Sequence, residues 1–407
     1  MNIGFVSVWA ERGAGYVTKA YLNILEKNNS VFVYARAGEI IKPTPEWNQE
    51  YVTWGKILPD TRISWNHFRK WIEKNKLEII FFNEQRDFRI LYQCKLFYPD
   101  VKLGTYIDYY KLDMVPSFKM YDFLICNTKR HQSVFSWHSQ AYYIPWGTDI
   151  DLYTPANDTF NLVNENVVTF FHSAGMATRK GTDTLLNVFL NTDLWKKSRL
   201  VLHTQRSLSS FTTLSKEELK EQNVEVIEKT VKAPGLYYMG DVYVYPTTLD
   251  GLGLTMYEAL SSGLPVITSN NAPMNEIVDD SVGALIAIEK YLSREDGYYW
   301  PLCYVDKADL YEKMNSFAEN PIEVCAMKKA ARLKAEERLD FSSRKKEIEK
   351  VFYDSKIIER NPEELKAYLK RDNKKKKSAA RVEAEKVLPV WMVDGANRMA
   401  KFIKGGY

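Results

Sequence analysis

The sequence predicts an α/β protein with two parallel-sheet domains that face each other across a cleft, followed by a helical, basic C-terminal extension. Short apolar runs alternate with longer helix-like stretches, which is typical of βαβ units. The same rhythm restarts near the middle of the chain, and 407 residues exceed what a single hydrophobic core usually organises. We therefore expect domains over residues 1–155 and 156–340, with the extension over residues 341–407.

Short apolar runs mark the candidate strands of both domains. In the first half they are Ile3–Val8, Ser30–Tyr34, Glu78–Phe82, Lys102–Ile107, Phe123–Cys126 and Ala141–Ile144. In the second half they are Val167–Phe171, Arg199–Leu202, Val224–Ile227, Val242–Tyr245 and Val266–Thr268. Between the halves, two prolines and a glycine in the segment Pro145–Pro155 favour a hinge. We expect the ligand-binding sites to lie in the loops at the carboxyl ends of the strands.

The composition excludes several classes of protein. Hydrophobic residues make up 45% of the chain and charged residues 27%, which is typical of a globular protein, and a net charge of +4 does not by itself indicate nucleic-acid binding. The N-terminus lacks a basic leader and no apolar run approaches a membrane span, so a cytoplasmic location is expected, with peripheral membrane contact left open. The cysteines lie far apart and are expected to be isolated thiols: Cys94, Cys126, Cys303 and Cys325.

The most informative stretch, Tyr245–Thr268, combines a strand end, a glycine loop, a helix and a second strand. Gly251 and Gly253 let backbone N–H groups approach a ligand, and the helix start behind them favours an anion such as a diphosphate. Asp250 lies before the loop and Glu258 is expected in the first helical turn, so both carboxylates can accept hydrogen bonds from sugar and ribose hydroxyls.

Glu258 also has a purely structural interpretation. Thr255-x-x-Glu258 matches a capping box, in which the glutamate satisfies the helix start. The two roles do not exclude each other, since each needs only one carboxylate oxygen.

A second stretch, Val167–Phe189, runs from a strand through a basic loop into a helix. In that loop, Arg179 and Lys180 are fixed cations that can stabilise the negative charge of a departing diphosphate. An isolated Arg-Lys pair is usually solvated, and Arg179 either serves the site or faces solvent.

The first half offers a glycine turn and an aspartate. Gly13 and Gly15 follow the first strand and open a helix, as a loop that approaches a phosphate does. Asp108 follows the run Lys102–Ile107 and either contacts a sugar hydroxyl or is an exposed strand-end residue.

Two features resemble sites but are not assigned as such. Asp149 and Asp151 form an Asp-x-Asp pair inside the hinge, and we assign no metal to them. His172 and His203 each follow a strand, and we expect hydrogen-bonded structural histidines there.

Together these stretches closely resemble the signature of the retaining glycosyltransferases that include glycogen synthase, sucrose synthase and bacterial mannosyltransferases. That family carries Glu-x7-Glu around a Gly-Phe-Gly loop, followed by Gly-x-Pro-Val-Ile. Here Asp250 stands at the first glutamate, Glu258 at the second, and Glu276 in the family's Glu-Ile-Val segment as a supporting residue. Met176 stands where relatives often have arginine. The resemblance covers roughly residues 1–350 and implies two Rossmann-like domains, the GT-B fold.

The resemblance also implies the activity and the site. The donor is a nucleotide-diphosphate sugar, the acceptor is an unidentified hydroxyl, and neither a metal nor another cofactor is required. The implied catalytic residues are Asp108, Lys180 and Asp250. The implied donor-binding residues are Gly13, Gly15, Arg179, Lys180, Gly251, Leu252, Gly253, Leu254 and Glu258.

Three functions remain open at this point. The first is a transferase in glycan or glycolipid synthesis, and the second is a transferase that glycosylates modified DNA bases. The third is a non-catalytic sugar-nucleotide binding protein, against which the presence of Lys180, Asp250 and Glu258 argues.

The extension adds a helix and a basic tail. Arg344–Tyr353 is expected to be a helix that packs back on the body, and a basic run over residues 370–381 precedes a possible amphipathic helix, Val390–Lys404. Such a tail is either solvated or attracts an anionic partner, and its apolar residues favour a membrane surface over DNA.

Overall fold

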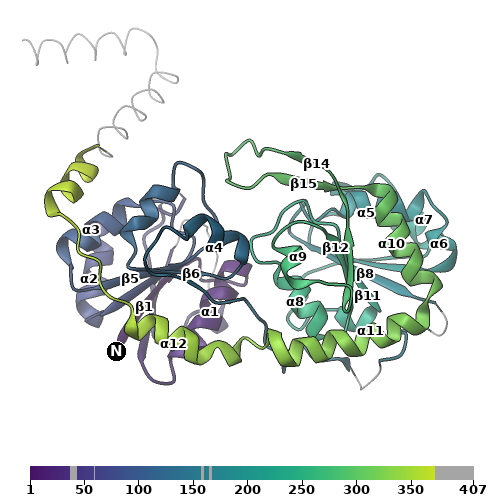
Figure 1. Ribbon diagram of the computed structural model, residues 1–407, viewed down its shortest axis with the longest axis horizontal. Helices are drawn as coiled ribbons and strands as arrows, with labels where there is room; N and C mark the ends of the chain where they lie inside the picture. The colour runs from purple at the N-terminus through teal and green to yellow at the C-terminus, as the bar shows by residue number, and fades with distance from the viewer. Residues whose placement is uncertain (37–43, 59, 157–159, 165–166, 372–407) are drawn as a thin grey trace, which may run out of the picture.

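The computed structural model describes residues 1–36, 44–58, 60–156, 160–164 and 167–371. Two parallel sheets lie side by side, each between layers of helices, which confirms the expected fold class (Figure 1). The basic residues beyond 371 and the expected helix Val390–Lys404 lie outside the described residues.

The first sheet has seven parallel strands in the order β3-β2-β1-β4-β5-β6-β7. The strands are β1 Asn2–Ser7, β2 Ser30–Ala35, β3 Val52–Trp54, β4 Ile79–Phe82, β5 Lys102–Tyr106, β6 Phe123–Cys126 and β7 Ala141–Tyr143. The helices are α1 Gly13–Leu25, α2 Trp65–Asn75, α3 Arg89–Phe97 and α4 Lys129–Phe135. All the expected strands of this half are present, and the short edge strand β3 was not expected.

The inner strands are apolar throughout because helices cover both faces of the sheet. In β4, Phe81 packs with residues of α1, whereas its neighbour Phe82 faces the opposite layer with α2. A Cβ at Gly104 in β5 would lie 2.1 Å from Phe123 Cζ, so glycine is needed there for this ring to cross the strand.

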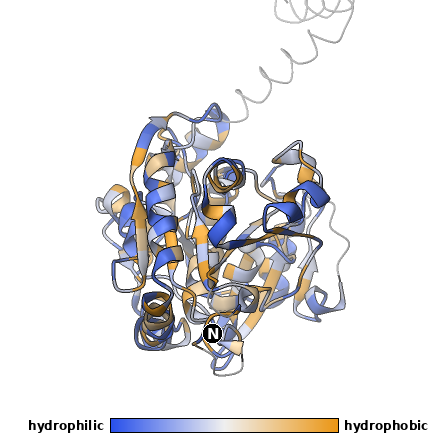
Figure 2. Ribbon diagram, turned by 90° about the vertical axis from the view of Figure 1, so that its right-hand side faces the viewer, coloured by the Kyte–Doolittle hydropathy of each residue, from blue (hydrophilic) through white to orange (hydrophobic). Residues whose placement is uncertain are grey.

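The second sheet has six parallel strands in the order β10-β9-β8-β11-β12-β13. The strands are β8 Thr169–Gly175, β9 Arg199–Thr204, β10 Val224–Glu228, β11 Val242–Tyr245, β12 Val266–Ser269 and β13 Gly283–Ile286. The helices are α5 Thr182–Leu190, α6 Leu194–Lys197, α7 Lys216–Glu221, α8 Leu254–Ser261, α9 Met274–Ile277, α10 Lys307–Glu319 and α11 Pro321–Lys334. In Figure 2, which looks onto this end of the molecule, hydrophobic residues gather on the strands and hydrophilic residues on the outer helix faces.

In both sheets the strand order reverses beside the first strand, at β1/β4 and at β8/β11. Such switch points leave a crevice at the carboxyl ends of the strands, where doubly wound proteins bind ligands. The loops after β1, β5, β8 and β11 therefore carry the candidate chemistry.

A hairpin that the sequence did not predict connects β13 to α10. Its strands, β14 Ile288–Leu292 and β15 Leu302–Val305, pair antiparallel and belong to neither large sheet. At its base, the Cys303 N–H donates to Thr248 O (2.9 Å), and near its tip the Tyr299 N–H donates to Tyr110 O in the first domain (3.0 Å). The hairpin thus extends from the second domain across the junction to the first domain (Figure 1).

After α11 the chain returns to the first domain. The expected helix is α12, Lys345–Asp354, which runs below β1 in Figure 1. Its Phe352 ring lies 5.0 Å from that of Phe81 and 5.1 Å from that of Phe123, and Lys102 Nζ donates to the Phe352 carbonyl (2.8 Å). The expectation that this helix packs back on the body is confirmed.

The cysteines are all free thiols, as expected, and Cys94, Cys126 and Cys303 are buried. Among the helices of the described residues, none combines the length and the apolar character needed to cross a membrane.

Candidate functional site

The loop after β11 holds Asp250 in a fully hydrogen-bonded setting. Its Oδ1 accepts the N–H of Gly253 (3.1 Å), and its Oδ2 accepts the hydroxyl of Tyr245. Burial would raise the pKa of Asp250, but Arg179, the Tyr245 hydroxyl and Lys180 together lower it below the ordinary value. The loop therefore presents a fixed negative charge between two cations.

The expected position of Glu258 in the first turn of its helix is wrong. Gly253, with φ 74°, is the N-cap of α8, so Glu258 is the fifth helical residue and no side chain caps the helix. The capping-box interpretation is wrong for the same reason, because Thr255 already lies inside the helix. Glu258 Oε2 instead accepts the hydroxyl of Tyr237 at 2.5 Å.

Glu258 therefore faces the interior of the site. Burial raises its pKa, while the hydroxyl of Tyr237 and the charge of Lys180 oppose that rise. Its negative charge also reaches the first domain, where burial, Glu11 and Glu258 raise the pKa of Tyr16 to about 12. A carboxylate placed in this way can accept hydrogen bonds from a ligand that lies between the domains.

The basic loop after β8 is tied to the loop that carries Asp250. Arg179 O accepts the N–H of Thr248 (2.8 Å), and Arg179 Nε donates to Leu249 O (2.9 Å). Arg179 is exposed, but its Nε is held against the loop that carries Asp250, so the side chain lies at the edge of the site and also faces solvent. Partial desolvation opposes its charge, but Asp250 above all raises the pKa of Arg179.

Lys180 lies deeper in the same loop. Its Nζ donates to Ser173 O (3.3 Å) and lies 5.5 Å from the centroid of the Tyr245 ring. Desolvation lowers the pKa of Lys180, whereas Asp250 and Glu258 raise it. Lys180 is therefore a cation held in place between both carboxylates.

The first domain brings Asp108 to this loop. A Cβ built at Gly251 would lie 1.9 Å from Asp108 Oδ1, so the carboxyl group rests on the Gly251 α-carbon. Burial, the neighbouring Glu84 and Asp250 raise the pKa of Asp108 well above its ordinary value, while Arg179 lowers it. Asp108 is partly buried at the meeting point of the domains, which excludes the exposed strand-end alternative.

The two glycines of the β1 loop differ in their surroundings. A Cβ at Gly13 would meet only Leu254 Cδ1 of α8, at 3.7 Å, so this position faces the second domain. A Cβ at Gly15 would lie 2.0 Å from Ala10 O, so this glycine is required by its own turn. Leu252 has a buried side chain within the core, and only its backbone can face a ligand.

The residues expected to be structural have that role. His172 is fully buried, with Nδ1 bonded to Val244 O (2.7 Å) and Nε2 to Thr182 Oγ1 (2.8 Å). His203 bonds Ser173 Oγ and Lys229 O, both at 2.9 Å.

The hinge aspartates shape a turn. Asp149 Oδ1 accepts the N–H groups of Asp151 (3.2 Å) and Leu152 (2.9 Å). Over the described part of the chain, no three acidic, histidine or cysteine side chains gather as a metal site would require.

Two residues link the site to the domain interface: Glu276, which the sequence indicated as a supporting residue, and Arg130, which it did not. Glu276 lies at the domain interface, where it accepts the N–H groups of Lys129 (2.6 Å) and Arg130 (2.8 Å) at the start of α4. Arg130 Nη2 in turn donates to Asp250 O (2.6 Å). The only sequence signal for Arg130 was Thr128. This residue caps α4 shortly after a strand, and therefore places the next residues at a sheet edge.

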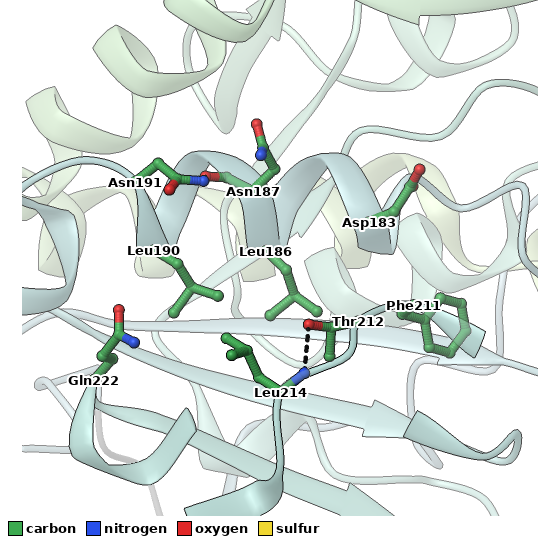
Figure 3. Close-up of a pocket in the computed structure, with 9 residues that line it drawn as sticks. All are labelled: Asp183, Leu186, Asn187, Leu190, Asn191, Phe211, Thr212, Leu214 and Gln222. Carbon is green, nitrogen blue, oxygen red and sulfur yellow. Dashed lines mark hydrogen bonds between the residues drawn. The ribbon is translucent and has the colours of Figure 1, made fainter. Parts of the chain in front are cut away.

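A separate surface pocket of about 310 Å³ lies on the second domain, away from these residues. Leu186 and Leu190 of α5 point into it toward Leu214, and polar side chains form its rim (Figure 3). None of the candidate site residues lines it.

Comparisons with known proteins agree with the geometry. Residues 165–294 match the family described as Glycosyl transferases group 1. Over 48 residues the chain is 42% identical to O-antigen chain mannosyltransferase B of Escherichia coli, a match that covers 12% of this chain and only 13% of that protein.

Solved structures resemble almost the whole described chain. Sucrose-phosphate synthase from Thermosynechococcus elongatus superposes with a TM-score of 0.68 at 16% identity, over 87% of this chain and 98% of that one. HepE from Anabaena, in complex with UDP-glucose, superposes with a TM-score of 0.65 at 14% identity, over 87% of this chain and 100% of that one. The chain thus has the two-domain GT-B fold, and its residues 165–294 are similar to the glycosyl transferases group 1 family.

Proposed function

We propose that the protein is a retaining glycosyltransferase that moves a hexosyl group from a nucleotide-diphosphate sugar to an acceptor hydroxyl. The observation that carries this proposal is the contact of Asp108, from the first domain, with the Gly251 loop of the second domain, where Asp250 and Glu258 act on Lys180. The donor class is supported by the similarity to HepE, which is described in complex with UDP-glucose.

The donor diphosphate has a matching set of positive groups. Arg179 and Lys180 supply two cations, and the free N–H groups at the start of α8 supply the positive end of a helix dipole. Glu258 is the acceptor for ribose hydroxyls, and Asp250 is the acceptor for sugar hydroxyls. Gly13 places the backbone at the start of α1 close to Leu254 of α8, where the two domains approach each other.

The chemical step requires charge stabilisation more than acid–base groups. The acceptor oxygen bonds to the anomeric carbon as the bond from that carbon to the diphosphate oxygen breaks, and the diphosphate takes the acceptor proton. Lys180 and Arg179 stabilise the charge that grows on the leaving diphosphate. Because attack and departure share one face of the sugar, the anomeric configuration is retained without a protein nucleophile.

Asp108 is placed to position the acceptor or the donor sugar. Its raised pKa favours the protonated carboxyl, which can donate a hydrogen bond to a sugar hydroxyl as well as accept one. Closure of the two domains excludes water that would otherwise hydrolyse the donor.

Three further features belong to the proposal. The reaction needs no metal, so transfer should persist after thorough treatment with EDTA, and restoration by manganese or magnesium would contradict this. The product is a glycan or glycolipid made in the cytoplasm. The basic tail brings the enzyme to an anionic membrane surface, so a chain that lacks residues 370–407 should lose binding to anionic vesicles while keeping activity on a small soluble acceptor.

A screen of nucleotide-diphosphate sugars for thermal stabilisation tests the donor class. A ligand at 100 times its dissociation constant adds about 2.7 kcal/mol of stability, which gives a clear shift in Tm. We expect one or a few of these sugars to stabilise the protein, and Glu258→Gln to reduce that stabilisation by about half at the same sugar concentration. Release of nucleotide diphosphate from the stabilising sugar separates an enzyme from a binding protein. No stabilisation by any nucleotide sugar would contradict the proposal.

A further inference from the structure

The start of α4, in the first domain, is held by groups of the second domain. Thr128 Oγ1 caps the helix by accepting the His131 N–H (3.1 Å), and Glu276 accepts the N–H groups of Lys129 and Arg130. A carboxylate at a helix N-terminus is favourable because it faces the positive end of the helix dipole. This contact forms only when the two domains approach each other.

Arg130 extends from that helix start into the second domain. Its Nη2 donates to Asp250 O (2.6 Å) and its Nη1 donates to Ala272 O, while only 6% of the residue is exposed. Both acceptors are backbone carbonyls of the other domain, and one belongs to the residue that carries the Asp250 carboxylate. The planar guanidinium can bond two carbonyls at once, which an ammonium group cannot do in the same geometry.

The hairpin closes over Arg130 from the other side. The guanidinium lies 5.1 Å from the centroid of the Trp300 ring, and Trp300 Nε1 donates to the Tyr110 hydroxyl (2.6 Å). The same hydroxyl contacts His131 Nδ1 at 3.0 Å. The Tyr110 hydroxyl thus accepts the indole N–H and is also hydrogen-bonded to the His131 ring, which links the hairpin to α4. Burial and the charge of Arg130 lower the pKa of His131 well below its ordinary value, so the ring is neutral beside the guanidinium.

We propose that Arg130 is a positioning residue of the transfer reaction: when the domains close, it fixes the loop Asp250–Gly253 against Asp108, with Trp300 of the β14–β15 hairpin holding the guanidinium in place. Asp250 and Gly251 then lie where Lys180 and Asp108 can act on the same donor. The consequence for catalysis depends on the proposed function, whereas the consequence for domain closure does not.

The contacts of Arg130 indicate that it positions the loop in the closed form rather than stabilises a single domain. Arg130 makes its guanidinium bonds with carbonyls of the second domain, so an open arrangement would leave it solvated without unfolding either domain. Loss of Arg130 should therefore shift the balance between open and closed forms more than it lowers the stability of a single domain.

The test uses the full chain and four variants. Arg130→Ala removes the guanidinium, and Arg130→Lys keeps the charge without the paired donors. Trp300→Phe keeps a ring over Arg130 but removes the bond to Tyr110. Arg199→Ala is the matched control, because Arg199 is an exposed arginine of the second domain that bonds Asn164. The readouts are the radius of gyration from X-ray scattering without ligand, and hydrogen exchange of residues 249–257.

We expect Arg130→Ala to increase the radius of gyration and to speed exchange in residues 249–257, with Arg130→Lys in between. Trp300→Phe should have a smaller effect, and Arg199→Ala none. In turnover assays, Arg130→Ala should lower kcat about tenfold or more, the range expected for the loss of hydrogen bonds from a charged donor, and change KM less.

Unchanged scattering and exchange in Arg130→Ala would overturn the inference. If Arg130→Ala does not fold, Arg130→Lys decides by the same two measurements. Because neither measurement needs turnover, a protein that transfers no sugar at all would contradict the proposed function and leave this test valid. Normal scattering together with normal sugar transfer in Arg130→Ala would overturn the role of Arg130 and leave the proposed function intact.

Discussion

The carboxyl group of Asp108, in the first domain, rests directly on the α-carbon of Gly251, in the second. A Cβ at Gly251 would lie 1.9 Å from Asp108 Oδ1 and 2.9 Å from Cγ. This contact joins the residues after β5 to the loop after β11, so a side chain at position 251 would have to displace the Asp108 carboxyl group. It also makes the position of Asp108 depend on closure.

Gly251→Ala should therefore displace the Asp108 carboxyl group or keep the domains apart. Because carboxyl oxygens can move more easily than backbone, we expect the variant to fold, with turnover reduced about a hundredfold by misplacement of a group near the reaction. Steady-state kinetics measure the expected loss of turnover, and a thermal melt shows whether the variant folds.

The double variant Gly251→Ala with Asp108→Ala shows whether the two positions interact. Removal of the carboxyl makes room for the new methyl group, so the double variant should close as the wild type does while remaining inactive. Additive effects on closure, measured by X-ray scattering, would show that the contact is not what sets the closed form.

Lys180→Ala should lower kcat more than it raises KM for the donor, because the charge on the diphosphate grows in the transition state. Loss of a fixed cation at this point should cost about 3 kcal/mol, or roughly a hundredfold in kcat. Lys220→Ala, at an exposed lysine of α7, is the control and should behave as the wild type. Wild-type turnover in Lys180→Ala would remove this residue from the reaction.

Glu258→Gln should weaken donor binding about tenfold, because a charged acceptor becomes a neutral one. Stability should hardly change, since Glu258 does not cap α8. The contrast is Ser215→Ala, which breaks the capping box that Ser215 and Glu218 form in α7 and should cost about 1 kcal/mol without changing donor affinity. Calorimetry with the stabilising nucleotide sugar measures the donor affinity of each variant, and thermal melts measure its stability.

Asp108→Asn should make the protein more stable at high pH. The folded protein holds the Asp108 proton to a higher pH than the unfolded chain does, so stability falls as the pH rises from the ordinary aspartate range toward the raised pKa. Asparagine removes that loss. We expect a higher Tm for the variant at about pH 8, similar values near pH 4, and lower activity throughout. Asp113→Asn, at an exposed aspartate, is the control. A Tm difference that does not change with pH would contradict the raised pKa.

Much of the fold could be predicted because the strands are apolar and regularly spaced. β13, Gly283–Ile286, was missed although it is apolar, whereas other missed strands lack that signal. β3 has only three residues at a sheet edge, and β14, Ile288–Leu292, is largely exposed, with Glu289 and Lys290 inside it. β14 pairs only with β15, and the loop between them contacts the first domain, so no local pattern of residues reveals the hairpin.

Some residues of the candidate site could also be predicted from the sequence, and others could not. Asp250, Lys180 and Glu258 could be identified because they lie within single stretches of sequence with recognisable order. Arg130 could not, because its partner Asp250 is 120 positions away and a lysine-arginine pair normally indicates a solvated surface. The capping-box pattern at Glu258 was wrong because the left-handed Gly253 starts α8 two residues earlier than that pattern requires.

The central claim is transfer from a nucleotide-diphosphate sugar with retention, and proton NMR of the first sugar product tests it most directly. The donor that stabilises the protein is incubated with the enzyme, with water or a simple alcohol as acceptor, and the anomeric signal is recorded before mutarotation. An α-linked donor should give the α product first, together with one nucleotide diphosphate for each sugar released, and Lys180→Ala should give neither at a comparable rate. A β product, or a sugar that binds but is never released from its nucleotide, would contradict the account.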